Sequence, residues 1–128
     1  MDMKKGLPLL ARTGFALQGL RIAATSEASF RTELLAAVVT MAVTAWLRPG
    51  WLWGALIAVA IGLVLALELI NTALEHAMDG LHSDHAPFVA VVKDCAAAAV
   101  LVSVALAVIL FAFMLLDTWP RWATLFQP

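Results

Sequence analysis

The strongest constraint on the fold is a run of seventeen residues, 51–67, that contains no ionisable side chain. This run leads directly into the polar sequence ELINTALEHAMD at residues 68–79. At about 100° per residue, as in an α-helix, most of its polar side chains fall on one side. They are Glu68, Asn71, Thr72, Glu75 and Asp79. The sequence thus predicts a long apolar helix that ends in a polar stripe, and this stripe is the first candidate site.

The overall composition indicates a membrane protein. Of the 128 residues, 63% are hydrophobic and 13% are charged, whereas soluble domains are about 45–50% apolar and about 25% charged. A water-soluble core of this size cannot hide so much apolar surface, so residues 1–128 are predicted to form a single membrane domain. The net charge of −1 provides no basic surface for nucleic acid. The single cysteine, Cys95, excludes an intrachain disulfide.

Three transmembrane helices are predicted, at about residues 28–47, 51–80 and 90–116, since a span needs about 20 residues. Arg48-Pro49-Gly50 is expected to form the turn between the first two, and Ser26 is a candidate N-cap for the first. Residues 82–88 are expected to form a loop and residues 117–128 a short tail. Residues 7–24 are basic and partly amphipathic but too polar to span, so they are predicted to lie in the membrane interface. The expected fold is an all-α membrane protein in which an amphipathic interfacial helix precedes three transmembrane helices.

Basic and aromatic residues predict the orientation. Five basic residues lie before the first span or in its first turn, and one lies in the turn after it, so the positive-inside rule places the N-terminus in the cytoplasm. These are Lys4, Lys5, Arg12, Arg21 and Arg31 on the N-terminal side, and Arg48 on the C-terminal side. The five tryptophans are expected at the opposite interface, as an aromatic belt. They are Trp46, Trp51, Trp53, Trp119 and Trp122.

Helical rise predicts where the polar residues lie. At 1.5 Å per residue, Glu68 is ~26 Å and Glu75 ~36 Å from Trp51, and Glu33 is ~21 Å from Leu47. In a hydrocarbon core about 30 Å thick, these groups converge near the cytoplasmic boundary. The same arithmetic brings Glu27 and Lys93 to this boundary.

Clustered carboxylates repel one another, so a cation should compensate them. Arg31, Lys93 and a divalent metal are the candidates. Oxygen-only ligation by few carboxylates suits Mg²⁺, which usually also coordinates substrate phosphates. His76 and His85 are interpreted as interfacial residues, because no arrangement of histidine, cysteine and carboxylate has zinc spacing. For Asp79, a solvated helix end and a functional role both stay open.

Three segments resemble the prokaryotic diacylglycerol kinase family, small trimeric membrane enzymes that phosphorylate a lipid hydroxyl with ATP. These are GFALQGLRIAATSEASFRTE at residues 14–33, ELINTALEHAMD at residues 68–79 and KDCAAAAVLV at residues 93–102. The resemblance implies a homotrimer with composite sites in the bacterial inner membrane. The chain departs from the family pattern at Ala16, Gln18, Val91 and Val92, and has His85-Ala86 where a Tyr-His pair is usual.

The resemblance also implies a role for each matching residue. Glu68 would be the general base, and Glu27 and Glu75 would hold Mg²⁺. The nucleotide would contact Lys93, Asp94 and Asn71. A further basic contact would come from Lys4, Lys5 or Arg12. Glu33 and Asp79 would line the site.

The sequence is compared with three possible functions. The leading hypothesis is an ATP-dependent kinase that converts diacylglycerol to phosphatidic acid. An undecaprenol kinase of the same fold is the alternative, because both acceptors are primary alcohols at the membrane surface. A small cation-coupled transporter is a more distant alternative, and it would be expected to place its carboxylate near the middle of the bilayer.

Overall fold

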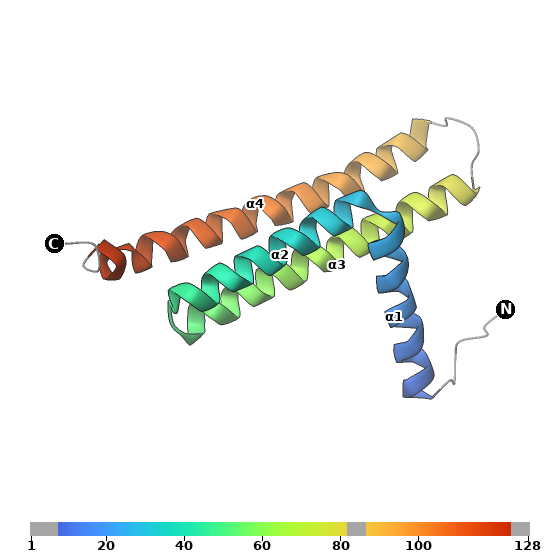
Figure 1. The fold of residues 1–128 in the computed structure, drawn as a ribbon. Coiled ribbons are helices and arrows are strands. Elements are labelled where there is room, and N and C mark those ends of the chain that lie inside the picture. Colours follow the sequence, from blue (N-terminus) through green and yellow to red (C-terminus); the bar gives the residue numbers. More distant parts are fainter. Residues whose placement is uncertain (1–7, 82–86, 124–128) are drawn as a thin grey trace.

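The computed structural model describes residues 8–81 and 87–123, and these form four helices. They are α1 (Leu9–Ser26), α2 (Ala28–Leu47), α3 (Trp51–Leu81) and α4 (Pro87–Ala123). Helices α2, α3 and α4 form an antiparallel bundle in which α3 packs against both neighbours, and α1 leaves the bundle at a steep angle (Figure 1). The described residues contain no strand. The all-α class is therefore confirmed.

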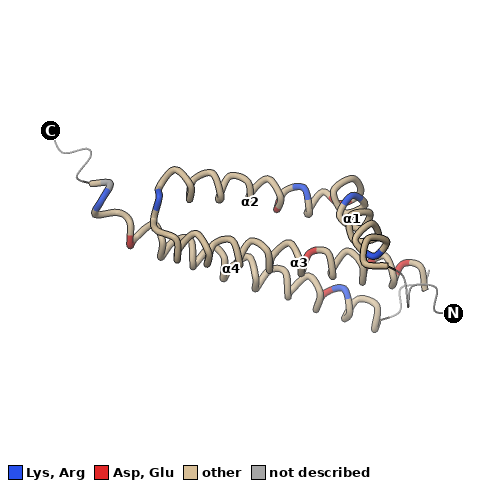
Figure 2. The backbone as a smooth tube through the Cα atoms, turned by 90° about the horizontal axis from the view of Figure 1, so that it is seen from below, with Lys and Arg blue, Asp and Glu red and all other residues tan. Residues whose placement is uncertain are grey.

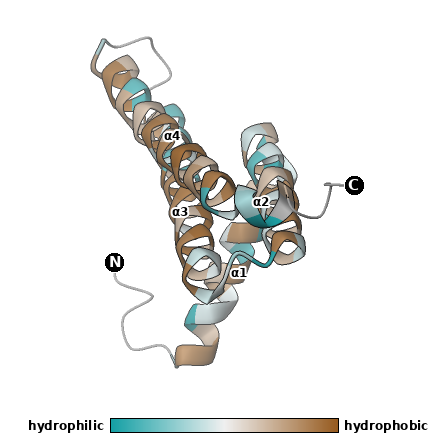
Figure 3. Ribbon diagram, turned by 90° about the vertical axis from the view of Figure 1, so that its left-hand side faces the viewer, coloured by the Kyte–Doolittle hydropathy of each residue, from teal (hydrophilic) through white to brown (hydrophobic). Residues whose placement is uncertain are grey.

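The three bundle helices are long and apolar enough to cross a membrane. Their residues are largely hydrophobic, as the brown colouring of α3 and α4 in Figure 3 shows. Leu35, Val59 and Leu101 are examples, one from each helix, with 66%, 70% and 69% of their surfaces exposed. Apolar surface on this scale requires lipid or other protein subunits to cover it. The fold is that of a multi-pass membrane protein.

Helix α1 contributes little to the core. Ala23 is its buried residue, while Leu10 and Leu17 are 86% and 65% exposed. A helix that leaves a transmembrane bundle steeply and exposes leucines is compatible with the interfacial location predicted for it.

The first turn of the bundle forms as predicted. Arg48 ends α2 in the left-handed conformation, with φ 47°, and its N–H donates to the Thr44 carbonyl over 3.1 Å. Gly50 follows with φ 111°, a value that glycine adopts without steric cost. Pro49 cannot continue the helix, so the chain reverses into α3.

The break between α1 and α2 falls at Glu27, which has extended backbone angles of φ −102° and ψ 119°. The prediction that Ser26 caps α2 is wrong. Ser26 is still helical, and its hydroxyl donates to the Ile22 carbonyl over 2.9 Å, as serine commonly does within helices. Arg31 closes the junction, because its Nη1 donates to the Thr25 carbonyl of the last turn of α1 over 3.2 Å. Glu27 is thereby placed at a corner of the bundle.

Helix α4 is longer than the predicted span of 90–116. It begins at Pro87, which the sequence suggested was in a loop, because proline suits the first turn of a helix. It also continues through Pro120 to Ala123, where a tail was expected. Two hydrogen bonds hold this final part: Thr118 Oγ1 donates to the Met114 carbonyl, and Trp53 Nε1 donates to Asp117 Oδ2, each over 2.8 Å. The rest of the predicted loop, residues 82–86, lies outside the described residues.

The α2–α3 turn and the C-terminal part of α4 lie at the same end of the bundle (Figure 1). We call this the tryptophan end and define it by Trp46, Trp51, Trp53, Asp117 and Trp119. Trp46, Trp51 and Trp119 are 70%, 84% and 68% exposed. The expected grouping of tryptophan-bearing helix ends is therefore present.

Candidate functional site

Most of the other charged positions gather at the opposite end of the bundle, where α1 joins (Figure 2). We call this the polar end. It is defined by the following residues: Glu27, Glu33, Glu68, Asn71, Glu75, His76, Asp79 and Lys93. The convergence predicted from helical rise is thus observed, and the contacts among these side chains show how each is placed.

Glu68 lies deepest in the polar end. It belongs to α3, is 2% exposed, and its Oε1 is buried without a hydrogen-bond partner among the described residues. Asn71, one turn further along α3, is 8% exposed, and its Oδ1 is also buried without a hydrogen-bond partner among the described residues. The Asn71 amide is held in place because Nδ2 donates to Glu75 Oε1 over 3.2 Å. Spacings of three and four residues place these groups on one helical face.

Glu33 approaches this face from α2. Its carboxyl group interacts electrostatically with that of Glu68, and its Oε2 is also buried without a partner among the described residues. A buried polar atom without a hydrogen bond costs about 1–3 kcal/mol. Three such atoms close together are hard to account for by stability, so they indicate groups that are kept for chemistry.

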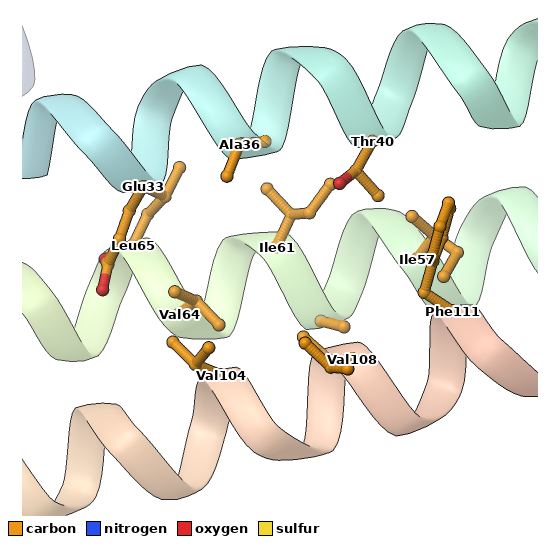
Figure 4. Close-up of a pocket in the computed structure, with 13 residues that line it drawn as sticks. Glu33, Ala36, Thr40, Ile57, Ile61, Val64, Leu65, Val104, Val108 and Phe111 are labelled. Atoms are coloured by element: carbon orange, nitrogen blue, oxygen red, sulfur yellow. The ribbon is translucent and has the colours of Figure 1, made fainter.

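A cavity of about 180 Å³ opens beside Glu33, between α2, α3 and α4. Glu33 is its one ionisable lining residue, and Thr40 adds a hydroxyl. The remaining lining is apolar and extends toward Ile57 and Phe111 (Figure 4). Pockets for drug-sized ligands are about 300–1,000 Å³, so this cavity suits a narrow hydrocarbon chain better than a head group.

Glu27 reaches the polar end from the α1–α2 junction. Its side chain is 23% exposed, and its Oε1 lies 3.9 Å from His76 Nε2 of α3. Ser26 Oγ lies 3.1 Å from the same Oε1, so its single proton is shared between Glu27 and the Ile22 carbonyl. The other ring nitrogen, His76 Nδ1, lies 2.9 Å from the Thr72 carbonyl oxygen. The break in the chain at Glu27 therefore places the Glu27 carboxylate next to the His76 imidazole.

Lys93 of α4 contacts Asp79 of α3, with 2.5 Å between Nζ and Oδ1. The two side chains are 33% and 66% exposed, and exposed ion pairs contribute about 0–1 kcal/mol. Lys93 can therefore exchange Asp79 for another anion at small cost. Asp94 is exposed beside Lys93 on α4.

Arg12 is not brought to the polar end. It is exposed in the first turn of α1, about 22 Å along the helix from Glu27 at 1.5 Å per residue, and the start of α1 lies away from the bundle (Figure 1). Its nucleotide contact stays a prediction.

The metal-binding capacity of the polar end is modest. Over residues 8–81 and 87–123, no three histidine, cysteine, aspartate or glutamate side chains lie close enough together to hold an ion. Mg²⁺ normally takes one or two protein carboxylates and completes its octahedron with water and substrate phosphates. The binding of Mg²⁺ by Glu27 and Glu75 therefore stays a prediction, which requires that a nucleotide and water supply the other ligands.

Some contacts were not anticipated from the sequence. Ser26 and Arg31 position Glu27, and Thr72 positions His76. The contact between Thr72 and His76 could be predicted from their four-residue spacing in a helix. The contact between His76 and Glu27 could not be predicted, because it depends on where the chain breaks between α1 and α2.

Comparison with known proteins identifies the family. The family model described as prokaryotic diacylglycerol kinase matches residues 14–115. The chain belongs to the prokaryotic diacylglycerol kinase family. The match spans every residue of the polar end and excludes Arg12 and Asp117. The family therefore shares the part of the chain that contains the buried carboxylates.

Curated members of the family align over most of the chain. The diacylglycerol kinase of Escherichia coli strain K12 is 30% identical over 107 residues, which cover 84% of this chain and 88% of that protein. The diacylglycerol kinase of Haemophilus influenzae is 30% identical over 95 residues, covering 74% and 80%. That of Synechocystis is 32% identical over 109 residues, covering 84% and 62%. A lipid kinase of the diacylglycerol kinase type is the class these relatives support.

Proposed function

We propose that the protein is an ATP-dependent kinase that phosphorylates diacylglycerol to phosphatidic acid at the membrane interface. The observation that carries the proposal is the placement of Glu68. Its buried carboxyl group, whose Oε1 has no hydrogen-bond partner among the described residues, lies beside Glu33, and Glu33 lines an apolar cavity between the transmembrane helices. A lipid whose chain occupies this cavity would present its hydroxyl to the two carboxyl groups.

In the proposed reaction, Glu68 accepts the proton of the lipid hydroxyl. The hydroxyl oxygen forms a bond to the γ-phosphorus of ATP. The bond from that phosphorus to the oxygen bridging the β-phosphate breaks, and ADP leaves with the electron pair. A positioned general base contributes typically about 10²–10⁴-fold to such a step. The Oε1 of Glu68 is compatible with this role, since no donor in residues 8–81 and 87–123 occupies it.

The remaining polar residues would position the nucleotide and neutralise its charge, which are the main requirements of phosphoryl transfer. Lys93 would exchange Asp79 for a phosphate oxygen, with Asp94 beside it. Asn71 would present its Oδ1 near the reacting groups. Glu27 and Glu75 would hold Mg²⁺, which when bound neutralises phosphate charge. Glu33 and Asp79 would line the site.

The protein is proposed to act as a homotrimer in the bacterial inner membrane, with its N-terminus in the cytoplasm. The largely exposed apolar faces of α2, α3 and α4 support an oligomer, and the excess of basic residues before α2 supports the orientation. In a trimer, helices of one subunit could complete the site of the next.

The test is a γ-phosphate transfer assay in mixed micelles, with [γ-³²P]ATP and either diacylglycerol or undecaprenol as acceptor. We expect Mg²⁺-dependent labelling of diacylglycerol to exceed that of undecaprenol. The reverse preference would reassign the acceptor within the family. Transfer to neither lipid would contradict the kinase hypothesis and favour the transporter hypothesis.

A further inference from the structure

The pairing of His76 with Glu27 suggests a metal ligand that the oxygen-only interpretation overlooks. A carbonyl oxygen only accepts hydrogen bonds, so His76 Nδ1 carries the proton in its 2.9 Å contact with the Thr72 carbonyl. In the neutral ring, the lone pair then lies on Nε2. Nε2 is the atom that faces Glu27 Oε1. Two electron-pair donors are thus directed at the same small volume.

The separation of these two atoms suits a bridging cation. At 3.9 Å they are too far apart for a direct hydrogen bond. Metal–nitrogen and metal–oxygen bonds of about 2.0–2.1 Å and about 2.0–2.2 Å place two ligands of one tetrahedral ion about 3.4 Å apart, so the two atoms would have to approach each other by about half an ångström. A first-row divalent cation therefore fits between His76 and Glu27 with small side-chain adjustments.

The surroundings of His76 match those of a ligating histidine. Metal-bound histidines usually donate their second ring N–H to a backbone carbonyl or a carboxylate, which orients the ring. The Thr72 carbonyl provides this support, and Ser26 Oγ steadies the same Oε1 of Glu27. The His76 side chain is 57% exposed, so an ion can reach it from the aqueous side.

We propose that His76 Nε2 and Glu27 Oε1 together bind the divalent cation that accompanies the nucleotide. The site consequently accepts transition metals such as Mn²⁺ and Co²⁺ as well as Mg²⁺. The reason is that an imidazole nitrogen is a better ligand for transition metals than for Mg²⁺. The inference rests on the proposed function, since nucleotide phosphates and water supply the remaining ligands. The proposal adds a nitrogen donor, His76, to the carboxylate pair of Glu27 and Glu75. This donor would change the metal selectivity of the site.

The test is pulsed EPR of Mn²⁺ bound, with β,γ-methylene-ATP, to the full chain in detergent micelles. Electron spin echo modulation detects a directly bound imidazole nitrogen. Protein made with ¹⁵N-histidine separates this signal from the adenine nitrogens. We expect the histidine modulation in the natural protein and its loss in His76→Ala. The affinity ratio of Co²⁺ to Mg²⁺ should fall by about tenfold in the variant, equivalent to about 1.4 kcal/mol.

The other histidines, His82 and His85, lie outside the described residues and provide the matched control. The double variant His82→Ala/His85→Ala should keep the modulation, and its loss there would overturn the inference. Bound Mn²⁺ without a histidine signal in the natural protein would overturn the role of His76 while leaving the proposed kinase intact. Failure to bind Mn²⁺, together with no lipid phosphorylation, would contradict both.

Discussion

The two ends of the helical bundle differ in how their polar side chains are satisfied. At the tryptophan end, the Trp53 indole donates to Asp117, and the buried hydroxyl of Thr118 donates to a backbone carbonyl. At the polar end, Glu33, Glu68 and Asn71 each keep a buried oxygen without a partner among the described residues. The difference agrees with the proposal that the polar end binds and reacts, while the tryptophan end contributes to stability.

Replacing a carboxylate at each end gives the largest expected contrast. Glu68→Gln should lower the rate of lipid phosphorylation by about 10²–10⁴-fold, because the amide cannot accept the hydroxyl proton. The measurement is initial rate at saturating ATP and lipid, alongside size-exclusion chromatography. Asp117→Asn is the matched control and should stay near the natural rate. Equal losses in both variants would remove the functional distinction between the ends.

A smaller effect is expected from the proposed metal ligands. Glu75→Gln keeps an oxygen that can accept from Asn71 Nδ2 but loses the charge that attracts Mg²⁺. A charged contact contributes about 1.5–3 kcal/mol, so the Mg²⁺ concentration for half-maximal activity should rise by about tenfold or more. Glu27→Gln should act in the same direction. Unchanged Mg²⁺ curves for both variants would assign these carboxylates to structure.

The cavity between the two ends allows a test of acceptor binding. Ala107 lines it, whereas the exposed Ala105 on the same helix does not. Ala107→Leu should raise the apparent KM for long-chain diacylglycerol by about fivefold or more, since overfilling a packed space costs about 1–3 kcal/mol. A short-chain acceptor should be less affected. The same increase in Ala105→Leu would show that the effect comes from elsewhere on α4.

At the tryptophan end, the expected change is in stability alone. Trp53→Phe removes the 2.8 Å hydrogen bond to Asp117, and a hydrogen bond contributes about 0.5–1.5 kcal/mol. Unfolding by SDS in mixed micelles should report a loss of this size, with kcat unchanged. A fall in kcat without loss of stability would mean that this end participates in the reaction.

The helices could be predicted from the sequence because hydrophobic length and breakers specify them. The uncharged run at residues 51–67 and the Arg48-Pro49-Gly50 turn marked α2 and α3 closely. Pro87 and Pro120 misled the boundaries of α4, since proline also begins helices and is tolerated near an end supported by tertiary hydrogen bonds.

The site was predictable only where a single helix defines it. The common face of Glu68, Asn71 and Glu75 follows from helical periodicity. The contact of Glu27 with His76 and the approach of Glu33 to Glu68 do not, because they depend on the corner at Glu27 and on the packing of α2 against α3. Arg12 shows the same limit, since the direction of α1 leaves it remote.

The central claim is that ATP is used at the polar end of the bundle. The most direct test is a latency measurement in sealed vesicles that hold no more than one protein particle each, with an affinity tag placed after the last residue. Capture through the tag selects vesicles whose tryptophan end faces outward. We predict that external ATP and Mg²⁺ support phosphorylation of diacylglycerol in the uncaptured vesicles, and in the captured ones only after detergent opens them. Full activity of intact captured vesicles would contradict the account.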